Sequence, residues 1–148
     1  MKNSSTRIQH TDQWSAERLL GLDPQSSNDL VASIIGGLPV ECLKTCAANC
    51  GLAVEGLASI VGLNPAKLAR RRAKGRLTSA ESDHLVSLSN TIACVMNLFS
   101  GGKVTAAKWF KTPSPALGNI TPLQMTRTHT GCRAVETAIG RLEHGVFS

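Results

Sequence analysis

Aliphatic side chains recur at helical spacing along this 148-residue chain, whereas runs of alternating β-branched residues are absent. Aromatic residues are few, with two Trp, three Phe and no Tyr. The clearest apolar stripe consists of Leu85, Leu88, Ile92, Val95, Met96 and Phe99. The sequence therefore predicts an all-α fold with an aliphatic core.

Glycine, proline and capping residues divide the chain into separate helices. Asn64-Pro65 and Thr121-Pro122 each combine an N-cap side chain with a first-turn proline, and Thr78 with Glu81 forms a capping-box pattern. Glycines follow most of the apolar segments and stop them. We expect helices over 28–35, 39–49, 54–61, 65–74, from 79 to about 100, over 103–110, from 122, and over 131–144.

Composition suggests three regions. Residues 1–27 are rich in Ser, Asn, Gln, Asp and Thr, which predicts a flexible N-terminal arm that Trp14, Leu19, Leu20 and Leu22 anchor in part. Residues 28–100 would form a central helical domain, and residues 101–148 a small C-terminal domain. No apolar signal core or membrane span is expected, because the longest uncharged stretch, 85–102, is interrupted by polar residues. We therefore expect a soluble cytoplasmic protein.

Positive charge is concentrated in one short segment. Residues 67–76 contain six cations and no carboxylate. The charge of this segment therefore equals the net charge of the whole chain, which is +6. Such a concentrated field is typical of a protein that binds a polyanion, although many charge runs are only solvated helix faces. The predicted DNA-binding residues are Lys67, Arg70, Arg71, Arg72, Lys74 and Arg76.

The cluster falls on the second helix of a predicted helix-turn-helix. Ala58 supplies the small residue where two helices cross, Gly62 supplies the turn, and Leu68 begins the buried face of the second helix. Short helix pairs of this kind also occur in folds that do not bind DNA. The charge on the second helix favours DNA binding, because that helix is the one that enters the groove.

The register assigns different roles to the six cations. Lys67, Arg70 and Lys74 share the outward face and are the expected base-edge or groove contacts, whereas Arg72 and Arg76 are expected to contact phosphate. Arg71 occupies a position where an apolar residue is usual. We expect its guanidinium to reach solvent or to meet Glu81 or Asp83.

Cysteine and histidine residues give no catalytic or metal motif. Cys42, Cys46 and Cys50 share one helix face, which suits either a metal site or a buried stripe of small side chains. A second ligand pair at zinc-site spacing is missing, so the buried stripe is favoured, and Cys94 and Cys132 are also interpreted as core residues. The histidines are scattered, and no nucleophile or phosphate-binding motif occurs. The chain is expected to be non-enzymatic and to need no cofactor or metal.

The C-terminal third carries a specific family resemblance. The run KWFKTPSPALGNITPL over 108–123, followed by GRLEHGVF over 140–147, resembles the toxin-binding domain of MbcA/ParS/Xre antitoxins. The segments LPV over 38–40 and RRRAKGRL over 70–77 resemble the Xre-like helix-turn-helix of the same family. The resemblance covers roughly residues 38–148.

This resemblance implies a type II antitoxin of the RES-Xre kind. Its partner would be a RES-domain toxin that depletes NAD, and the antitoxin would obstruct the toxin's active site. The complex would bind its own operator as a repressor. Independently of the resemblance, we expect a homodimer within the hetero-oligomer through a DNA-binding and dimerisation domain over 28–100, because symmetric operators need paired half-sites, and we expect no membrane association. The resemblance assigns toxin binding to Trp109, Pro113, Leu117, Gly118, Pro122, Glu143, His144, Gly145, Val146, Phe147 and Ser148.

Some features leave alternatives open. Asn119 stands where the family has a second glycine, so we expect that turn to differ in backbone angle. Val146 and Phe147 follow a helix-stopping glycine, so this apolar pair would either fold back or insert into a partner. An alternative interpretation is a stand-alone helix-turn-helix regulator with a helical dimerisation domain. A third interpretation is a metal or redox sensor that uses the cysteine stripe.

Overall fold

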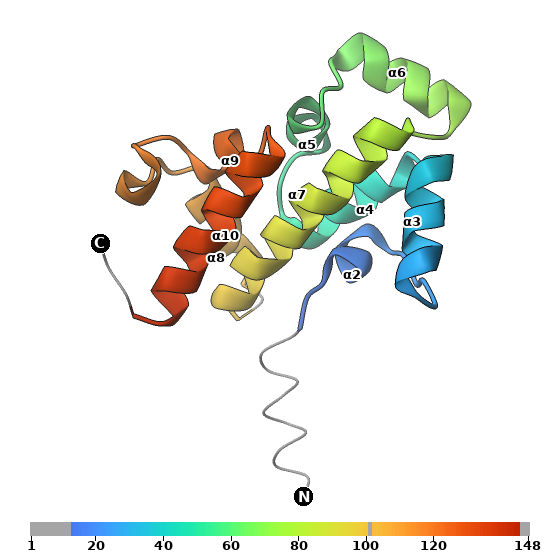
Figure 1. The fold of residues 1–148 in the computed structure, drawn as a ribbon. Coiled ribbons are helices and arrows are strands. Elements are labelled where there is room, and N and C mark those ends of the chain that lie inside the picture. The colour runs from blue at the N-terminus through green and yellow to red at the C-terminus, as the bar shows by residue number, and fades with distance from the viewer. Residues whose placement is uncertain (1–12, 101, 146–148) are drawn as a thin grey trace, which may run out of the picture.

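A computed structural model describes residues 13–100 and 102–145, and within these ranges the chain is helical and contains no β-strand. The predicted all-α fold is confirmed. The elements, shown in Figure 1, are α2 (Ala16–Leu20), α3 (Ser27–Gly36), α4 (Glu41–Cys50), α5 (Val54–Ile60), α6 (Pro65–Lys74), α7 (Ser79–Leu98), α8 (Lys103–Phe110), the 3-10 helix η1 (Pro115–Leu117), α9 (Pro122–Met125) and α10 (His129–Glu143).

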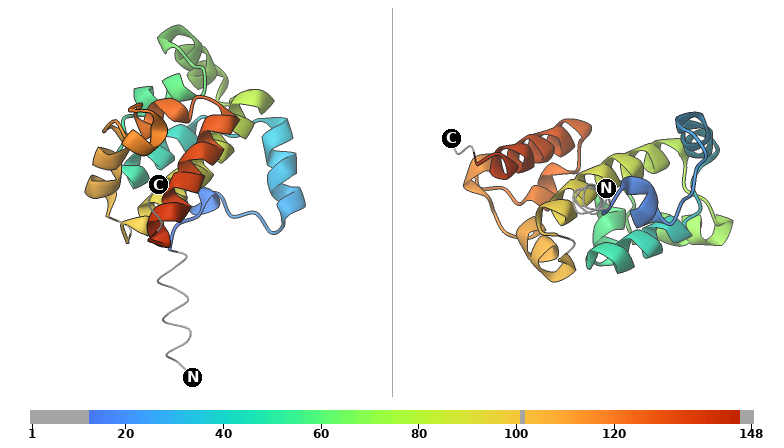
Figure 2. Two further views of the ribbon diagram at one scale, coloured as in Figure 1. Left: turned by 60° about the vertical axis from the view of Figure 1, so that its left-hand side comes forward. Right: turned by 90° about the horizontal axis from the view of Figure 1, so that it is seen from below.

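The long helix α7 forms the centre of the fold. α10 packs along it from one side, and α2, α3 and α4 pack against it from the other (Figures 1 and 2). Its predicted apolar stripe is fully buried from Leu85 to Met96, and Phe99 is half-buried at its C-terminal end. Because α7 is covered on both sides, the predicted DNA-binding and C-terminal regions share one hydrophobic core.

Local signals account for most helix ends. Thr78 and Glu81 form the expected capping box, and the side chains of Asn64 and Thr121 accept hydrogen bonds from the first turns of α6 and α9. α10 begins slightly earlier than expected, because the Thr128 hydroxyl accepts a hydrogen bond from the backbone N–H of Gly131 at 2.9 Å.

Part of the predicted flexible arm belongs to the core. The side chains of Leu19 and Leu20 in α2 are at most 2% exposed, and the backbone of Trp14 exchanges two hydrogen bonds with the Asn97 amide at 2.9 and 3.0 Å. The expected anchors Trp14, Leu19 and Leu20 therefore attach this part of the segment to the core. The rest of the predicted arm up to residue 12 lies outside the described residues.

Among the helices of residues 13–100 and 102–145, none combines the length and the apolar character that crossing a membrane requires.

Candidate functional site

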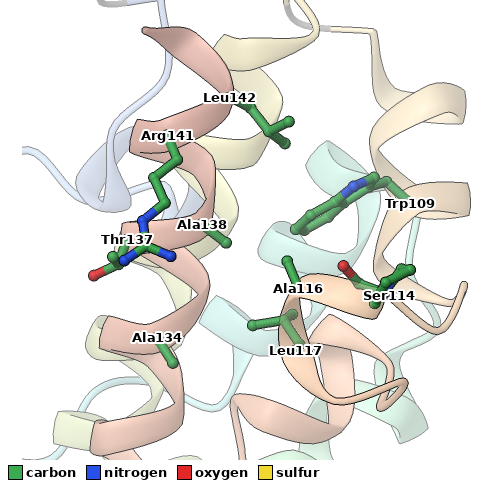
Figure 3. Close-up of a pocket in the computed structure, with 10 residues that line it drawn as sticks. Trp109, Ser114, Ala116, Leu117, Ala134, Thr137, Ala138, Arg141 and Leu142 are labelled. Atoms are coloured by element: carbon green, nitrogen blue, oxygen red, sulfur yellow. The ribbon is translucent and has the colours of Figure 1, made fainter. Parts of the chain in front are cut away.

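A groove of about 740 Å³ separates α10 from the segment that carries Trp109 and η1 (Figure 3). Trp109 and Leu117 approach from one side, and Ala138 and Leu142 face them from α10. The groove is lined by Trp109, Ser114, Pro115, Ala116, Leu117, Ala134, Thr137, Ala138, Arg141 and Leu142. Its apolar walls with a few polar groups are typical of a site for a ligand or a partner's side chains.

The α10 wall arises from the helical repeat. Ala134, Thr137, Ala138, Arg141 and Leu142 follow the spacing i, i+3, i+4, i+7, i+8, so they form one stripe along the helix. A separate stripe of α10, which includes Val135 and Ile139, is buried in the core. α10 therefore has one face in the core and a second face along the groove. The small alanine side chains of the second face leave open space next to the helix.

An aromatic cluster fixes the opposite wall. The Trp109 ring lies 5.7 Å from the Phe110 ring in an edge-on arrangement and 6.5 Å from the tilted Phe99 ring, measured between centroids. Phe110 is 1% exposed, whereas Trp109 is half-buried. The indole is therefore held in place by buried neighbours while part of its surface lines the groove.

The loop around η1 keeps a left-handed backbone at two adjacent positions. Gly118 has a φ of +68° and Asn119 a φ of +63°, and the Asn119 backbone N–H donates to the Ser114 carbonyl at 2.8 Å. Asparagine tolerates the left-handed region better than most residues. Asn119 therefore has a left-handed backbone of the kind that a glycine adopts without strain.

The structure brings together only some of the residues that the resemblance assigns to toxin binding. Trp109 and Leu117 line the groove, while Pro113 is exposed and Gly118 caps η1. Pro122 is buried at the start of α9 rather than in the groove. The end of α10 exposes three further residues of this set, Glu143, His144 and Gly145. The remaining three, Val146, Phe147 and Ser148, lie outside the described residues.

The α10 side of the groove was missed by sequence reasoning. Its five residues do repeat at helical spacing, but two alanines, a threonine and an arginine do not form a recognisable apolar stripe. Only the fold shows that this second face of α10 is turned toward Trp109.

The basic cluster lies on a helix pair with the expected turn. α5 and α6 are joined through Gly62, which has a φ of +91°, and Leu57, Ala58 and Leu68 are buried beneath the pair. Lys67, Arg70 and Lys74 are exposed, as the predicted register requires. This arrangement presents one cationic face of α6 to solvent.

Arg71 is taken up by an ion pair within the fold. Its Nε donates to Oε1 of Glu81 at 2.8 Å and a terminal nitrogen donates to Oε2 at 2.9 Å, with both side chains less than 20% exposed. Burial opposes ionisation of Glu81, but the hydrogen bonds from Arg71 and from the Thr78 backbone outweigh it and hold the pKa of Glu81 below its usual value. The expected partner of Arg71 is therefore Glu81, and its guanidinium is not a free DNA contact.

We expect Glu81→Gln to lower the free energy of unfolding by about 1–2 kcal/mol at pH 7, because it removes a two-point ion pair while the glutamine can still complete the capping box. The depressed pKa of Glu81 means that its contribution is complete above the unfolded-state pKa of about 4.3 and is lost as the pH falls through the folded-state value. Urea unfolding at pH 7 and pH 3 should therefore show a difference from wild type that shrinks at the lower pH. Glu55→Gln, at an exposed position of α5, is the control; an unchanged difference at pH 3 would contradict the role of the carboxylate.

The two predicted phosphate contacts have neighbours of their own. Arg72 borders a hollow that it shares with Glu41 and Glu55. A terminal nitrogen of Arg76 donates to the Gly37 carbonyl at 2.7 Å and so ties the end of α6 to the end of α3. These two cations therefore lie apart from the exposed face of Lys67, Arg70 and Lys74.

The cysteine stripe of α4 is part of the core. Cys42, Cys46 and Cys50 are at most 4% exposed, and the Cys46 sulfur lies 3.7 Å from the Ser89 hydroxyl. Among the described residues, no three His, Cys, Asp or Glu side chains gather in a way that could hold a metal ion. Cys132 is buried as expected, whereas Cys94 is exposed and its assignment to the core is wrong. Cys94 lies between core residues of α7 in the sequence, but its side chain is on the exposed side of the helix.

This difference predicts that one thiol reacts quickly with a thiol reagent in the native protein. We expect rapid labelling of Cys94 and at least 100-fold slower labelling of the four buried cysteines, because the thiolate must reach the reagent. Mass spectrometry of the labelled native chain would assign the site, with the Cys94→Ser variant as the control. Fast labelling of any cysteine in the folded Cys94→Ser variant would contradict the burial of the other four.

Comparison with known proteins identifies the family. Residues 95–145, which include the whole groove, match the family model described as the antitoxin Xre/MbcA/ParS C-terminal toxin-binding domain. The chain is 33% identical over 132 residues to a protein named antitoxin Xre from Yersinia enterocolitica, covering 88% of this chain and 89% of the relative. It is 31% identical over 145 residues to an antitoxin Xre from Photorhabdus laumondii, covering 97% and 96% of the two chains. The chain therefore belongs to the Xre family of antitoxins.

Proposed function

We propose that this antitoxin neutralises a RES-domain toxin that depletes NAD, by binding the toxin and obstructing its active site. The same chain represses its own operon by binding operator DNA as a dimer. In this proposal the protein is non-enzymatic and acts in the cytoplasm, where both the toxin and the operator are found. Residues 28–100 serve DNA binding and residues 101–148 serve toxin binding.

The groove between α10 and Trp109 carries the toxin-binding part of the proposal. It lies within the segment that matches the toxin-binding domain. The small alanines on its α10 wall leave room for apolar side chains of a partner. Leu142 lines the groove only three residues before Gly145. A toxin seated in the groove would therefore also meet the C-terminal end of the chain, including the proposed contacts Glu143 to Ser148.

The exposed cations of α6 support the DNA-binding part. Lys67, Arg70 and Lys74 lie on the outward face of the second helix of the pair, where groove contacts are made in helix-turn-helix proteins. Arg71 is left out of this proposed contact surface because Glu81 binds it.

Co-expression with the product of the adjacent gene tests the toxin-binding proposal. We expect that product alone to stop growth and lower cellular NAD, and the full chain to restore both and to co-purify with it. Deletion of Gly145 to Ser148 should remove this protection, because the proposal assigns toxin contacts to these residues. Val104→Arg, at a position of α8 that is 81% exposed and does not line the groove, is the control. Full protection by the truncated chain would contradict the tail contact, and an adjacent product without toxicity would favour a stand-alone regulator.

A further inference from the structure

Helix α3 is apolar but has no buried residue. It carries Leu30, Val31, Ile34 and Ile35 within ten residues. Leu30 and Ile34 pack partly against the core, whereas Val31 is 52% exposed and Ile35 is 68% exposed. The helix therefore has an inner apolar stripe with a partner and an outer one without a partner among the described residues.

The outer stripe has the spacing of a helix-pairing face. Asn28, Val31, Ala32 and Ile35 follow i, i+3, i+4, i+7, and all four are exposed. Ala32 and the neighbouring Gly36 are small, and a side chain added at Gly36 would meet no atom within 4 Å. A second helix can therefore approach α3 closely, and α3 stands at the edge of the molecule in both views of Figure 2.

A stable interface needs more than one short helix, since a dimer of ordinary size buries about 800 Å² on each partner. The surface beside α3 supplies a continuation. A hollow of about 580 Å³ is lined by Ala32, Ser33 and Gly36 of α3 together with Leu22, Pro39 and Arg76. The outer stripe and this hollow form one surface, which we call the α3 face.

Charge on the α3 face favours an antiparallel partner helix of the same kind. The acidic Asp29 lies in the first turn of α3, and the cationic Arg76 lies at the other end, where it binds the Gly37 carbonyl. Ser33, one turn after Asp29, lines the hollow together with Arg76, so both charges border the same flank. In an antiparallel pair each Asp29 comes near the Arg76 of the other copy, whereas a parallel pair keeps Asp29 and Arg76 of different copies at opposite ends.

Other occupants match the α3 face less well. α3 contains no Lys or Arg, which disfavours DNA as its partner. The segment that matches the toxin-binding domain begins at residue 95 and does not include α3.

We propose that a second copy of this chain docks on the α3 face, with the two α3 helices antiparallel and the two-fold axis between Val31 and Ala32. This proposal rests on the proposed DNA binding, for which it supplies the symmetric pair of α6 helices. α3 is joined rigidly to the end of α6, because Arg76 binds Gly37 and the Leu77 backbone N–H donates to the Leu38 carbonyl at 2.9 Å. The geometry of the α3 pair thus sets the separation of the two α6 helices and the spacing of the operator half-sites.

The mass of the free chain in solution tests the α3 face without toxin or DNA. Sedimentation equilibrium should give twice the 15.6 kDa chain mass for wild type. Val31→Glu combined with Ile35→Glu should weaken the dimer at least 100-fold and give a monomer. The melting temperature should change little, since neither side chain is buried. Val104→Glu, at an 81% exposed position of α8, should remain dimeric.

Three results would overturn the proposal: a monomeric wild type at 100 µM, a double variant that stays dimeric, or a control that dissociates equally. Toxin co-purification by the double variant is measured separately. Retained toxin binding with lost dimerisation supports the α3 face, whereas loss of toxin binding by wild type would contradict only the proposed function.

Disulfide cross-linking tests the antiparallel arrangement. In a Cys94→Ser background, which removes the exposed thiol, Ala32→Cys should form a covalent dimer on mild oxidation because the two copies meet near the axis. Asn28→Cys lies on the same face one turn earlier, and its two copies are too far apart to bond in an antiparallel pair. Cross-linking of both variants would indicate a parallel pair and overturn the proposed geometry, as would cross-linking of neither.

Discussion

The largest expected loss of toxin binding follows from Ala138→Arg. A long cationic side chain at the middle of the α10 stripe fills the groove opposite Leu117 and places a charge against its apolar walls. We expect affinity for the toxin to fall at least 100-fold, together with loss of growth protection. Titration calorimetry with purified toxin would measure the change.

Two further variants separate groove filling from unfolding. Ala138 is half-buried, so its thermal unfolding must be compared with wild type, and Leu142→Asp provides a second test at a 40% exposed position of the same groove. Val104→Arg adds the same side chain outside the groove and should bind toxin normally. Wild-type affinity in both groove variants would show that the toxin binds elsewhere.

The second large effect concerns DNA. Replacing Lys67, Arg70 and Lys74 together by Ala should weaken operator binding on the order of 100-fold near physiological salt, because the three expected base-edge or groove contacts of α6 are lost. Each of the three cations that also neutralises a phosphate adds about 0.9 to the slope of log affinity against log salt, so the slope should become less steep by at most about 2.7. Fluorescence anisotropy with the DNA upstream of the gene, measured at several salt concentrations, checks both values.

A matched control separates local contact from overall charge. Replacing Lys44, Lys108 and Lys111 by Ala removes the same charge from exposed positions on α4, α8 and the residue after α8. This control should change the affinity only several-fold, through the weaker long-range field. An equal effect of both triple variants would argue against α6 as the reading helix.

Local signals made most of the helices predictable from the sequence. The capping residues Asn64, Thr78 and Thr121 act within one turn, so neighbouring residues alone determine those helix starts. The partner of Arg71 was also predictable, because Glu81 follows after a short turn. In each case the two interacting groups are at most ten residues apart.

Features that depend on distant contacts were not predictable. The sequence marks Leu19 and Leu20 as anchors but does not show that α4 and α7 supply the surface that buries them, and the hydrogen bond of Arg76 to Gly37 joins residues 39 positions apart. The groove needed the fold as well, because small residues such as Ala134 and Ala138 become informative only when a partner surface is opposite them. The exposure of Cys94 depends likewise on which side of α7 its neighbours cover.

The burial of α7 on both sides has a consequence for how the antitoxin is removed. One continuous core extends from α2 to α10, so neither half keeps its own stable centre once the other opens. A cellular protease that captures the unfolded chain would therefore destroy the cationic helix and the groove in a single event. Under the proposed function, release of the toxin and renewed transcription of the operon would then begin together.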